Sequence, residues 1–114
     1  MAQQDRFTLP ANTRFGITAW VNAGYTQKIT VYVDEVPQAE FSGSGSDDRN
    51  LGTKVVNSGK GNVRVAISAN GKNSDLVSTH VILANKPNFV VIGSEDSTDN
   101  DYNDSIVFLN WPLG

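Results

Sequence analysis

The segment Lys28-Ile29-Thr30-Val31-Tyr32-Val33-Asp34 alternates polar and apolar side chains along its whole length. A second segment, Asn62-Val63-Arg64-Val65-Ala66-Ile67-Ser68, alternates in the same way. Successive side chains of a β-strand point to opposite faces, so each segment predicts a strand with one face buried. The sequence shows no helical periodicity beside these strands, and the predicted class is therefore all-β.

Other segments are rich in β-branched and aromatic residues, which favour strands. Residues 15–21 and 79–83 read as more fully buried strands, and residues 89–92 and 106–109 as two more. Asn70-Gly71 separates two strand-like runs and predicts a tight hairpin with positive φ at both positions.

Turn-forming residues recur between these segments. We expect breaks at Pro10, 22–24, 42–45, 57–59, 85–87 and Pro112, and a loop over 42–48. The 114 residues therefore predict a single domain over residues 1–114, folded as an antiparallel β-sandwich of about nine short strands.

Charge is distributed unevenly along the chain. Residues 87–114 carry five acids and no bases, whereas residues 1–86 carry nine bases and seven acids. This balance, without any basic stripe, argues against a nucleic-acid partner. The longest apolar runs are too short for membrane insertion.

The composition also bears on localisation. There is no cysteine, so disulfides and thiolate metal sites are excluded and the redox compartment stays open. The first residues lack the apolar segment of a secretory signal. We expect a soluble protein, cytoplasmic or exported without a visible signal peptide, that acts at the cell surface or extracellularly.

An acidic run near the C-terminal end is the main candidate functional site. Ser94-Glu95-Asp96-Ser97-Thr98-Asp99-Asn100-Asp101-Tyr102-Asn103-Asp104 holds five carboxylates within ten residues, and no Lys or Arg follows Lys86. Two such charges about 5 Å apart repel by roughly 3 kcal/mol at an effective dielectric constant near 20. The charges of this run must therefore be screened by solvent or neutralised by a strongly positive partner.

The spacing within this run suggests calcium. Asp99, Asp101 and Asn103 alternate, and Asp104 follows directly, which resembles the first half of a calcium-binding loop. The run is not an EF-hand, because Asp104 occupies the Gly position, Asn110 occupies the Glu position, and the flanks look like strands. A solvated acidic loop and a catalytic carboxylate pair are the alternatives.

Other residues that could carry chemistry have simpler explanations. Trp20 and Trp111 are read as core or interface aromatics. His80 is the only histidine, and nothing near it in sequence suggests a nucleophile or triad, so it is read as structural. The apolar end at 110–114 suggests a packed terminus, and Gly114 leaves its α-carboxylate free to approach a cation. The alternative is a last strand that simply ends.

Several motifs together closely resemble the LecB (PA-IIL) family of bacterial calcium-dependent fucose/mannose-binding lectins. The resemblance covers essentially the whole chain. It rests on Phe7-Thr8-Leu9-Pro10-Ala11-Asn12-Thr13-Arg14-Phe15-Gly16, Ser74-Asp75-Leu76-Val77-Ser78, Gly93-Ser94-Glu95-Asp96, Thr98-Asp99-Asn100-Asp101-Tyr102-Asn103-Asp104 and Asn110-Trp111-Pro112-Leu113-Gly114.

This resemblance implies an antiparallel β-sandwich with two adjacent calcium ions per subunit that contact the sugar directly. One ion would be held by Glu95, Asp99, Asp101 and Asp104. The other would be held by Asn22, Asp101, Asn103 and Asp104, together with the Gly114 carboxylate of a neighbouring subunit. The family pattern also implies a homodimer through the C-terminus, usually assembled into a homotetramer.

The same resemblance implies which residues surround the sugar. These are Ala23, Gly24, Tyr25, Asp96, Ser97, Asp99, Asp101, Asn103, Asp104 and Gly114. Ser at position 23 would go with fucose preference and Ala with mannose preference, so Ala23 favours mannose. Tyr25 and Ser97 depart from the family pattern, and Tyr25 could shield the site, stack on a second sugar ring or turn outward.

The predicted function is therefore a non-enzymatic lectin that binds mannose- or fucose-containing glycans. The alternative is a calcium-stabilised structural or adhesin-like sandwich without sugar binding. A glycosidase would need one carboxyl with a raised pKa in an apolar pocket, whereas the residues around the acidic run are polar.

Overall fold

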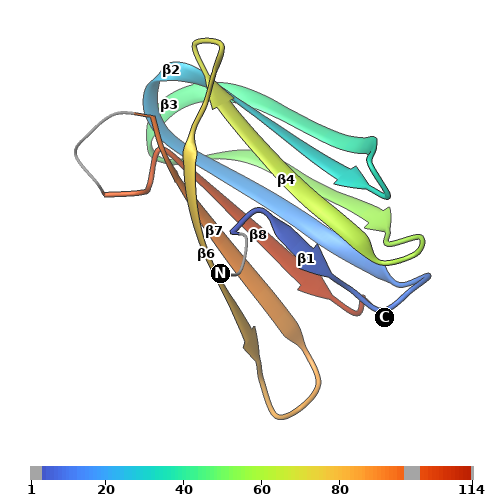
Figure 1. Cartoon of the computed structure of the whole chain (residues 1–114). Coiled ribbons are helices and arrows are strands. Elements are labelled where there is room, and N and C mark those ends of the chain that lie inside the picture. The colour runs from blue at the N-terminus through green and yellow to red at the C-terminus, as the bar shows by residue number, and fades with distance from the viewer. Residues whose placement is uncertain (1–3, 97–100, 114) are drawn as a thin grey trace.

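The computed structural model describes residues 4–96 and 101–113, and the regular structure of these residues consists of β-strands (Figure 1). The strands are β1 (Arg6–Thr8), β2 (Arg14–Val33), β3 (Val36–Asn57), β4 (Asn62–Ala69), β5 (Lys72–Asn73), β6 (Asp75–Ile82), β7 (Asn88–Glu95) and β8 (Ser105–Trp111). No helix capable of crossing a membrane occurs in these two ranges.

The strands form one antiparallel sheet that curls into two layers, because β2 and β3 each belong to both. The first half of β2 pairs with β8, from Gly16↔Asn110 to Val21↔Ser105. Its second half pairs with β4, from Gln27↔Ala69 to Val33↔Val63. We call the layer of β6, β7, β8 and the first half of β2 the β8 layer, and that of β1, β4 and the second half of β2 the β4 layer. This arrangement confirms the all-β, antiparallel prediction.

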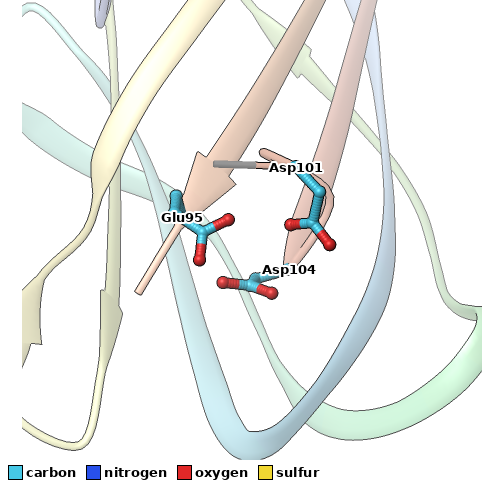
Figure 2. A group of neighbouring side chains, drawn as sticks. All are labelled: Glu95, Asp101 and Asp104. Carbon is cyan, nitrogen blue, oxygen red and sulfur yellow. The ribbon is translucent and has the colours of Figure 1, made fainter. Parts of the chain in front are cut away.

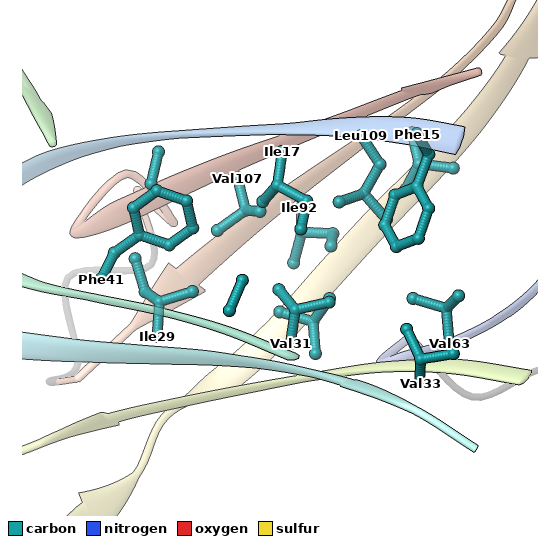
Figure 3. Packing of buried hydrophobic residues seen from close by; sticks show 14 of the residues in the cluster. Phe15, Ile17, Ile29, Val31, Val33, Phe41, Val63, Ile92, Val107 and Leu109 are labelled. Atoms are coloured by element: carbon teal, nitrogen blue, oxygen red, sulfur yellow. The ribbon is translucent and has the colours of Figure 1, made fainter. Parts of the chain in front are cut away.

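The core lies between the two layers and follows the alternation seen in the sequence. Ile17 and Leu109 point inward from the β8 layer, and Ile29, Val31 and Val63 point inward from the β4 layer (Figure 3). Each of these side chains is almost completely buried, which stabilises the fold by about 1.5–3 kcal/mol per side chain. The strands predicted over 28–34 and 62–68 are confirmed.

The strand count is close to the roughly nine expected, but two strands are much longer than predicted. The described residues form eight strands, and β2 and β3 contain 20 and 22 residues. The expected break at 22–24 lies inside β2, and the expected loop at 42–48 lies inside β3. The β2–β3 pairing shifts register between Val21 and Ala23 and again between Ala23 and Gln27. Such irregularities bend a strand without ending it, which carries β2 from one layer to the other.

Two further local predictions have opposite outcomes. The Asn70-Gly71 hairpin is confirmed, with φ values of 52° and 78°, and it joins β4 to β5. The prediction that residues 79–83 are more fully buried was wrong, because Val81 and Ile82 are 42% and 55% exposed. They lie on β6, the outermost strand of the β8 layer, where a run of apolar residues does not imply burial on both faces.

The two tryptophans lie in different environments. Trp111 is 3% exposed within the core, and the ring of His80 lies 5.2 Å from it. Trp20 faces outward on the β8 layer, 6.4 Å from the ring of Phe108. After β8 the backbone N–H of Leu113 donates a hydrogen bond to the Arg14 carbonyl oxygen (3.2 Å), which holds this end of the chain beside the start of β2.

Candidate metal centre

The described residues of the acidic run, 94–96 and 101–104, lie where β7 ends and β8 begins, against the bend of β2 (Figure 1). The backbone N–H of Asp104 donates to the carbonyl oxygen of Ser94 (3.1 Å), which closes the connection between the two strands. The backbone N–H of Asn22 donates to the carbonyl oxygen of Asp104 (2.9 Å). These two bonds place the β2 bend and the acidic connection side by side.

A glycine allows the connection to fold back over β7. A Cβ atom at position 93 would collide with the carbonyl oxygen of Tyr102, so no larger residue fits at Gly93 without moving the backbone. The N–H of Tyr102 donates to Glu95 Oε1 (3.1 Å). Together these contacts bring Asp101 back toward the carboxylate of Glu95.

Three carboxylates converge at this point. Oxygens of Glu95, Asp101 and Asp104 lie within 4.8 Å of one another, and their side chains point toward one another in Figure 2. Glu95 and Asp104 are buried, at 3% and 8% exposure, whereas Asp101 is exposed. Of the other predicted site residues, Ser97, Asp99 and Gly114 lie outside the described ranges.

Burial raises the pKa of Asp104 to about 7. The hydrogen bond from the backbone N–H of Asp96 to Asp104 Oδ2 (2.8 Å) opposes this rise, while the charges of Asp96 and Glu95 add to it. A raised carboxyl pKa means that ionising Asp104 at this buried position costs free energy. A cation bound there would lower that cost.

No basic residue follows Lys86, so these acids have no positively charged neighbour in the sequence. The ion pairs among residues 4–96 and 101–113 join Arg6 or Arg64 to Glu35 and Lys28 to Glu40, so none of them neutralises Asp101 or Asp104. The donor set consists of oxygen atoms, which are the ligands of hard cations such as calcium. The residues present therefore fit that ion.

Asn103 adds an adaptable oxygen ligand to the cluster. With its amide nitrogen turned toward Asp101, Nδ2 donates to both carboxylate oxygens, at 3.0 and 3.1 Å. A half-turn of the amide replaces the nitrogen by Oδ1 and aims a third oxygen at the same place. One side chain can thus satisfy Asp101 as a donor or join it as a cation ligand.

The side chain of Asn22 is held by residues distant in sequence. Its Nδ2 donates to Asp48 Oδ1 (2.6 Å) and to the carbonyl oxygen of Asn103 (3.1 Å), while its Oδ1 accepts a hydrogen bond from the N–H of Asp48 (2.7 Å). Asn22 therefore joins the bend of β2, strand β3 and the acidic connection at one point. Sequence reasoning identified Asn22 but missed Asp48.

A pocket of about 480 Å³ opens beside the carboxylates. Its wall contains the bend residues Ala23, Gly24 and Tyr25 as well as Asp96 and Asp104. This volume lies within the range typical of small-ligand sites. The structure thus brings the specificity residues 23–25 and two of the predicted metal ligands, Asn22 and Asp104, to one pocket.

Sequence reasoning also missed a buried support beneath this pocket. Gln27 is fully buried, and its Nε2 donates to Asp96 Oδ2 (3.2 Å) and to the carbonyl oxygen of Tyr25 (3.1 Å). Its Oε1 accepts a hydrogen bond from Ser105 Oγ (2.9 Å). No local pattern singles out Gln27, because its partner Ser105 is 78 residues away in the sequence.

The known proteins that this chain resembles are lectins. Residues 7–113 match the fucose-binding lectin II (PA-IIL) family. The structure of the Chromobacterium violaceum lectin CV2L in complex with α-methyl-fucoside is similar, with 64% identity, a TM-score of 0.97, and coverage of 99% of this chain and 100% of that chain. Comparison with curated proteins gives no match.

Two further solved structures are similar over the full length. The high-affinity mannose-binding lectin of Ralstonia solanacearum is 62% identical, with a TM-score of 0.97 and coverage of 99% and 100% of the two chains. The C-terminal domain of the Burkholderia cenocepacia lectin BC2L-C is 51% identical, with a TM-score of 0.93 and full coverage of both chains. Lectins bind carbohydrates without altering them, so the expectation of a non-enzymatic protein is confirmed. This chain belongs to the PA-IIL fucose-binding lectin family.

Proposed function

We propose that this protein is a calcium-dependent lectin that binds mannose and fucose residues of glycans, with mannose preferred. The observation that carries the proposal is the convergence of Glu95, Asp101 and Asp104 beside a pocket lined by Ala23 and Asp96. Two calcium ions together take about 12–16 oxygen ligands. The three carboxylates supply at most six oxygens, so coordination places remain for sugar hydroxyls even after the other proposed ligands are added.

The membership of the PA-IIL family supports two ions per subunit. Glu95, Asp99, Asp101 and Asp104 would hold one ion. Asn22, Asp101, Asn103 and Asp104 would hold the other, so that Asp101 and Asp104 bridge both. When bound, the calcium ions would be coordinated directly by vicinal hydroxyl groups of the sugar. Asp96 remains available to accept hydrogen bonds from ring hydroxyls, which strengthens binding because its carboxylate is charged.

The preference for mannose rests on Ala23. Its methyl group offers no hydrogen bond at the pocket wall, where a serine would offer one. The relatives support recognition of both sugars: the Ralstonia protein is a high-affinity mannose-binding lectin, and the Chromobacterium lectin was solved with a fucoside. Ser97 would stand beside the sugar as a further polar contact.

The completion of the second ion site calls for a second copy of the chain. Leu113 is hydrogen-bonded to Arg14, whereas the metal centre adjoins Asn22, eight positions along β2. Eight residues of strand span roughly 25 Å. Gly114 follows Leu113 in the sequence, and this separation supports the proposal that its carboxylate serves the centre of another subunit.

The outward surface of the β8 layer supports such a dimer. Its central outward positions carry no charged side chain, and Trp20, Phe89 and Phe108 pack together there, with ring centroids 6.4 and 5.4 Å apart. Val77 and Val91 continue this surface and are 44% and 38% exposed. A face of this composition is typical of an interface between subunits. A homodimer, assembled further into a homotetramer, would cover it.

Isothermal titration calorimetry with methyl α-mannoside and methyl α-fucoside tests the proposal. We expect binding of both sugars in calcium, tighter binding of the mannoside, and loss of both after chelation with EDTA. Asp101→Asn is expected to abolish binding, while Asp47→Asn, an exposed acid outside the cluster, leaves it intact. Sugar binding that persists in EDTA would refute the proposal; calcium binding without any sugar binding would favour a structural role.

A further inference from the structure

We infer that the protein has a second sugar subsite next to the metal centre, formed by Tyr25 and the β4–β5 hairpin, that takes a neutral hexopyranose linked to the coordinated sugar. The inference rests on the proposed lectin function and extends it from a monosaccharide to an oligosaccharide. It assigns Tyr25 the role of a platform between two sugar rings.

A second pocket lies directly beside the first. It has a volume of about 310 Å³ and is lined by Tyr25, Ala69, Asn70, Lys72, Asn73, Ser74, Asp75, Glu95 and Asp96. Tyr25 and Asp96 also line the pocket at the metal centre, so the two pockets share a boundary. A ligand that fills the first pocket can therefore extend past Tyr25 and Asp96 into the second.

Tyr25 stands at this boundary with its ring available to a ligand. The side chain is 61% exposed, the largest exposed fraction among the exposed large apolar residues in the described ranges. Its backbone is fixed by the buried amide of Gln27, which donates to the Tyr25 carbonyl oxygen (3.1 Å). An aromatic face held in place next to two pockets suits the apolar C–H face of a pyranose, and the phenolic hydroxyl suits its polar rim.

The β4–β5 hairpin supplies polar groups to the lining of the second pocket. Asn70 and Gly71 both adopt positive φ, which fixes the two-residue turn and pairs Ala69 with Lys72. Asn70, Lys72 and Asn73 then offer amide and ammonium donors to the pocket. Figure 1 shows the hairpin at the same end of the sandwich as the bend of β2.

The floor of this pocket favours a partly polar occupant. Ala69 is 5% exposed and offers only a methyl group. The hydroxyl of Ser74 is buried and lacks a hydrogen-bond partner within residues 4–96 and 101–113. An unpaired buried hydroxyl is unfavourable, so a hydroxyl-bearing ligand or its water that reached this wall would gain a partner.

The charge of the pocket excludes acidic sugars. With Glu95 committed to the metal centre, Asp75 and Asp96 line it against one cation, Lys72. A carboxylated or phosphorylated second ring would meet this negative excess, whereas a neutral hexose would meet only hydrogen-bonding groups. The occupant is therefore a neutral ring.

The test compares methyl α-mannoside with the α-1,2-, α-1,3- and α-1,6-linked mannobioses by calorimetry on the calcium-loaded protein. We expect at least one mannobiose to bind about three- to tenfold more tightly than the monosaccharide, as one aromatic stacking contact would give. Equal affinity of the monosaccharide and all three mannobioses would overturn the subsite. Failure of the monosaccharide itself to bind would instead refute the proposed function.

Variants distinguish the platform from a general effect on the site. Tyr25→Ala is expected to remove the disaccharide advantage, expressed as the ratio of the two affinities, while Tyr25→Phe retains it. Lys72→Ala is expected to lower the same ratio with methyl α-mannoside binding unchanged. Lys86→Ala, at the turn between β6 and β7, is the matched control and should change neither value. A ratio that survives in both Tyr25→Ala and Lys72→Ala would place the second ring elsewhere.

Discussion

Asn22 and Asp48 hold each other through two reciprocal hydrogen bonds, from Asn22 Nδ2 to Asp48 Oδ1 (2.6 Å) and from the Asp48 N–H to Asn22 Oδ1 (2.7 Å). This pair ties the bend of β2 to β3 at the position where β2 contacts the acidic connection. The orientation of Asn22 at the metal centre therefore depends on a residue that does not belong to the centre.

Replacing Asp48 by Gly should weaken calcium and sugar binding together. Gly removes the carboxylate and tolerates the φ of 52° at this position, so the backbone is not strained. We expect a loss of stability of about 1 kcal/mol, typical of one hydrogen bond, with a severalfold weaker calcium affinity. Asp48→Asn keeps the acceptor oxygen and serves as the control. Thermal melting and calcium titration measure both effects; unchanged calcium affinity in the Gly variant would show that Asn22 needs no support.

Replacing the buried Gln27 by Met should destabilise the protein by about 1–3 kcal/mol, because Ser105 Oγ would lose its buried partner. Asp96 would also lose the amide that fixes it, so sugar affinity should fall. Ser105→Ala removes the Gln27–Ser105 bond but leaves the Gln27–Asp96 bond intact, and its sugar affinity should stay near that of the unaltered protein. Equal sugar affinities for both variants would contradict a positioning role for Gln27.

Removing calcium should lower the melting temperature. A ligand present at about 1,000 times its dissociation constant stabilises the folded state by about 4 kcal/mol, which chelation would remove. Differential scanning calorimetry in calcium, in EDTA and in magnesium measures the effect. We expect magnesium to substitute poorly, because it demands tighter octahedral geometry. A melting temperature that is the same in calcium and EDTA would exclude an ion at the cluster.

The chelated protein should become less stable as the pH rises from about 4 to about 7. Burial raises the folded-state pKa of Asp104 to about 7 from 3.8, so the folded state binds more protons than the unfolded state across this window. Stability falls with pH wherever that holds. Asp104→Asn cannot titrate, and the fall should flatten in this variant. Denaturant melts at several pH values in EDTA, with and without the substitution, provide the comparison.

A charge placed on the outward face of the β8 layer should prevent self-association. Phe108→Glu would set a carboxylate between Trp20 and Phe89, where a dimer interface would bury it unpaired. Ser42→Glu adds the same charge to the outward face of the β4 layer, beside Lys28, and is the control. Analytical ultracentrifugation should show a monomer for the first and an unchanged oligomer for the second. An unchanged oligomer in both variants would move the interface to another surface.

Local patterns account for the parts of the fold that depend on neighbouring residues. The alternation at 28–34 and 62–68 determines which side chains of β2 and β4 enter the core, and Asn70-Gly71 determines the hairpin. The acidic run supplied the convergent carboxylates because its members are adjacent in sequence. Each of these features is encoded within about ten residues.

The parts that could not be predicted depend on distant contacts. The small and polar residues at 22–24 and 42–48 are compatible with a loop and with a bulged strand. Pairing between β2 and β3 makes both segments parts of strands. Asp48 meets Asn22 across 26 positions, and Gln27 meets Asp96 across 69. No spacing rule connects such partners until the two layers are assembled.

The bend of β2 constrains how recognition can change in this protein. Ala23, Gly24 and Tyr25 lie between two paired halves of one strand, each with its own register against β3. An insertion or deletion of one residue here would invert the inward and outward sides of one half and expose its apolar positions to water. Ligand preference can therefore be retuned by exchanging side chains at fixed chain length, whereas length variants at this bend should fail to fold.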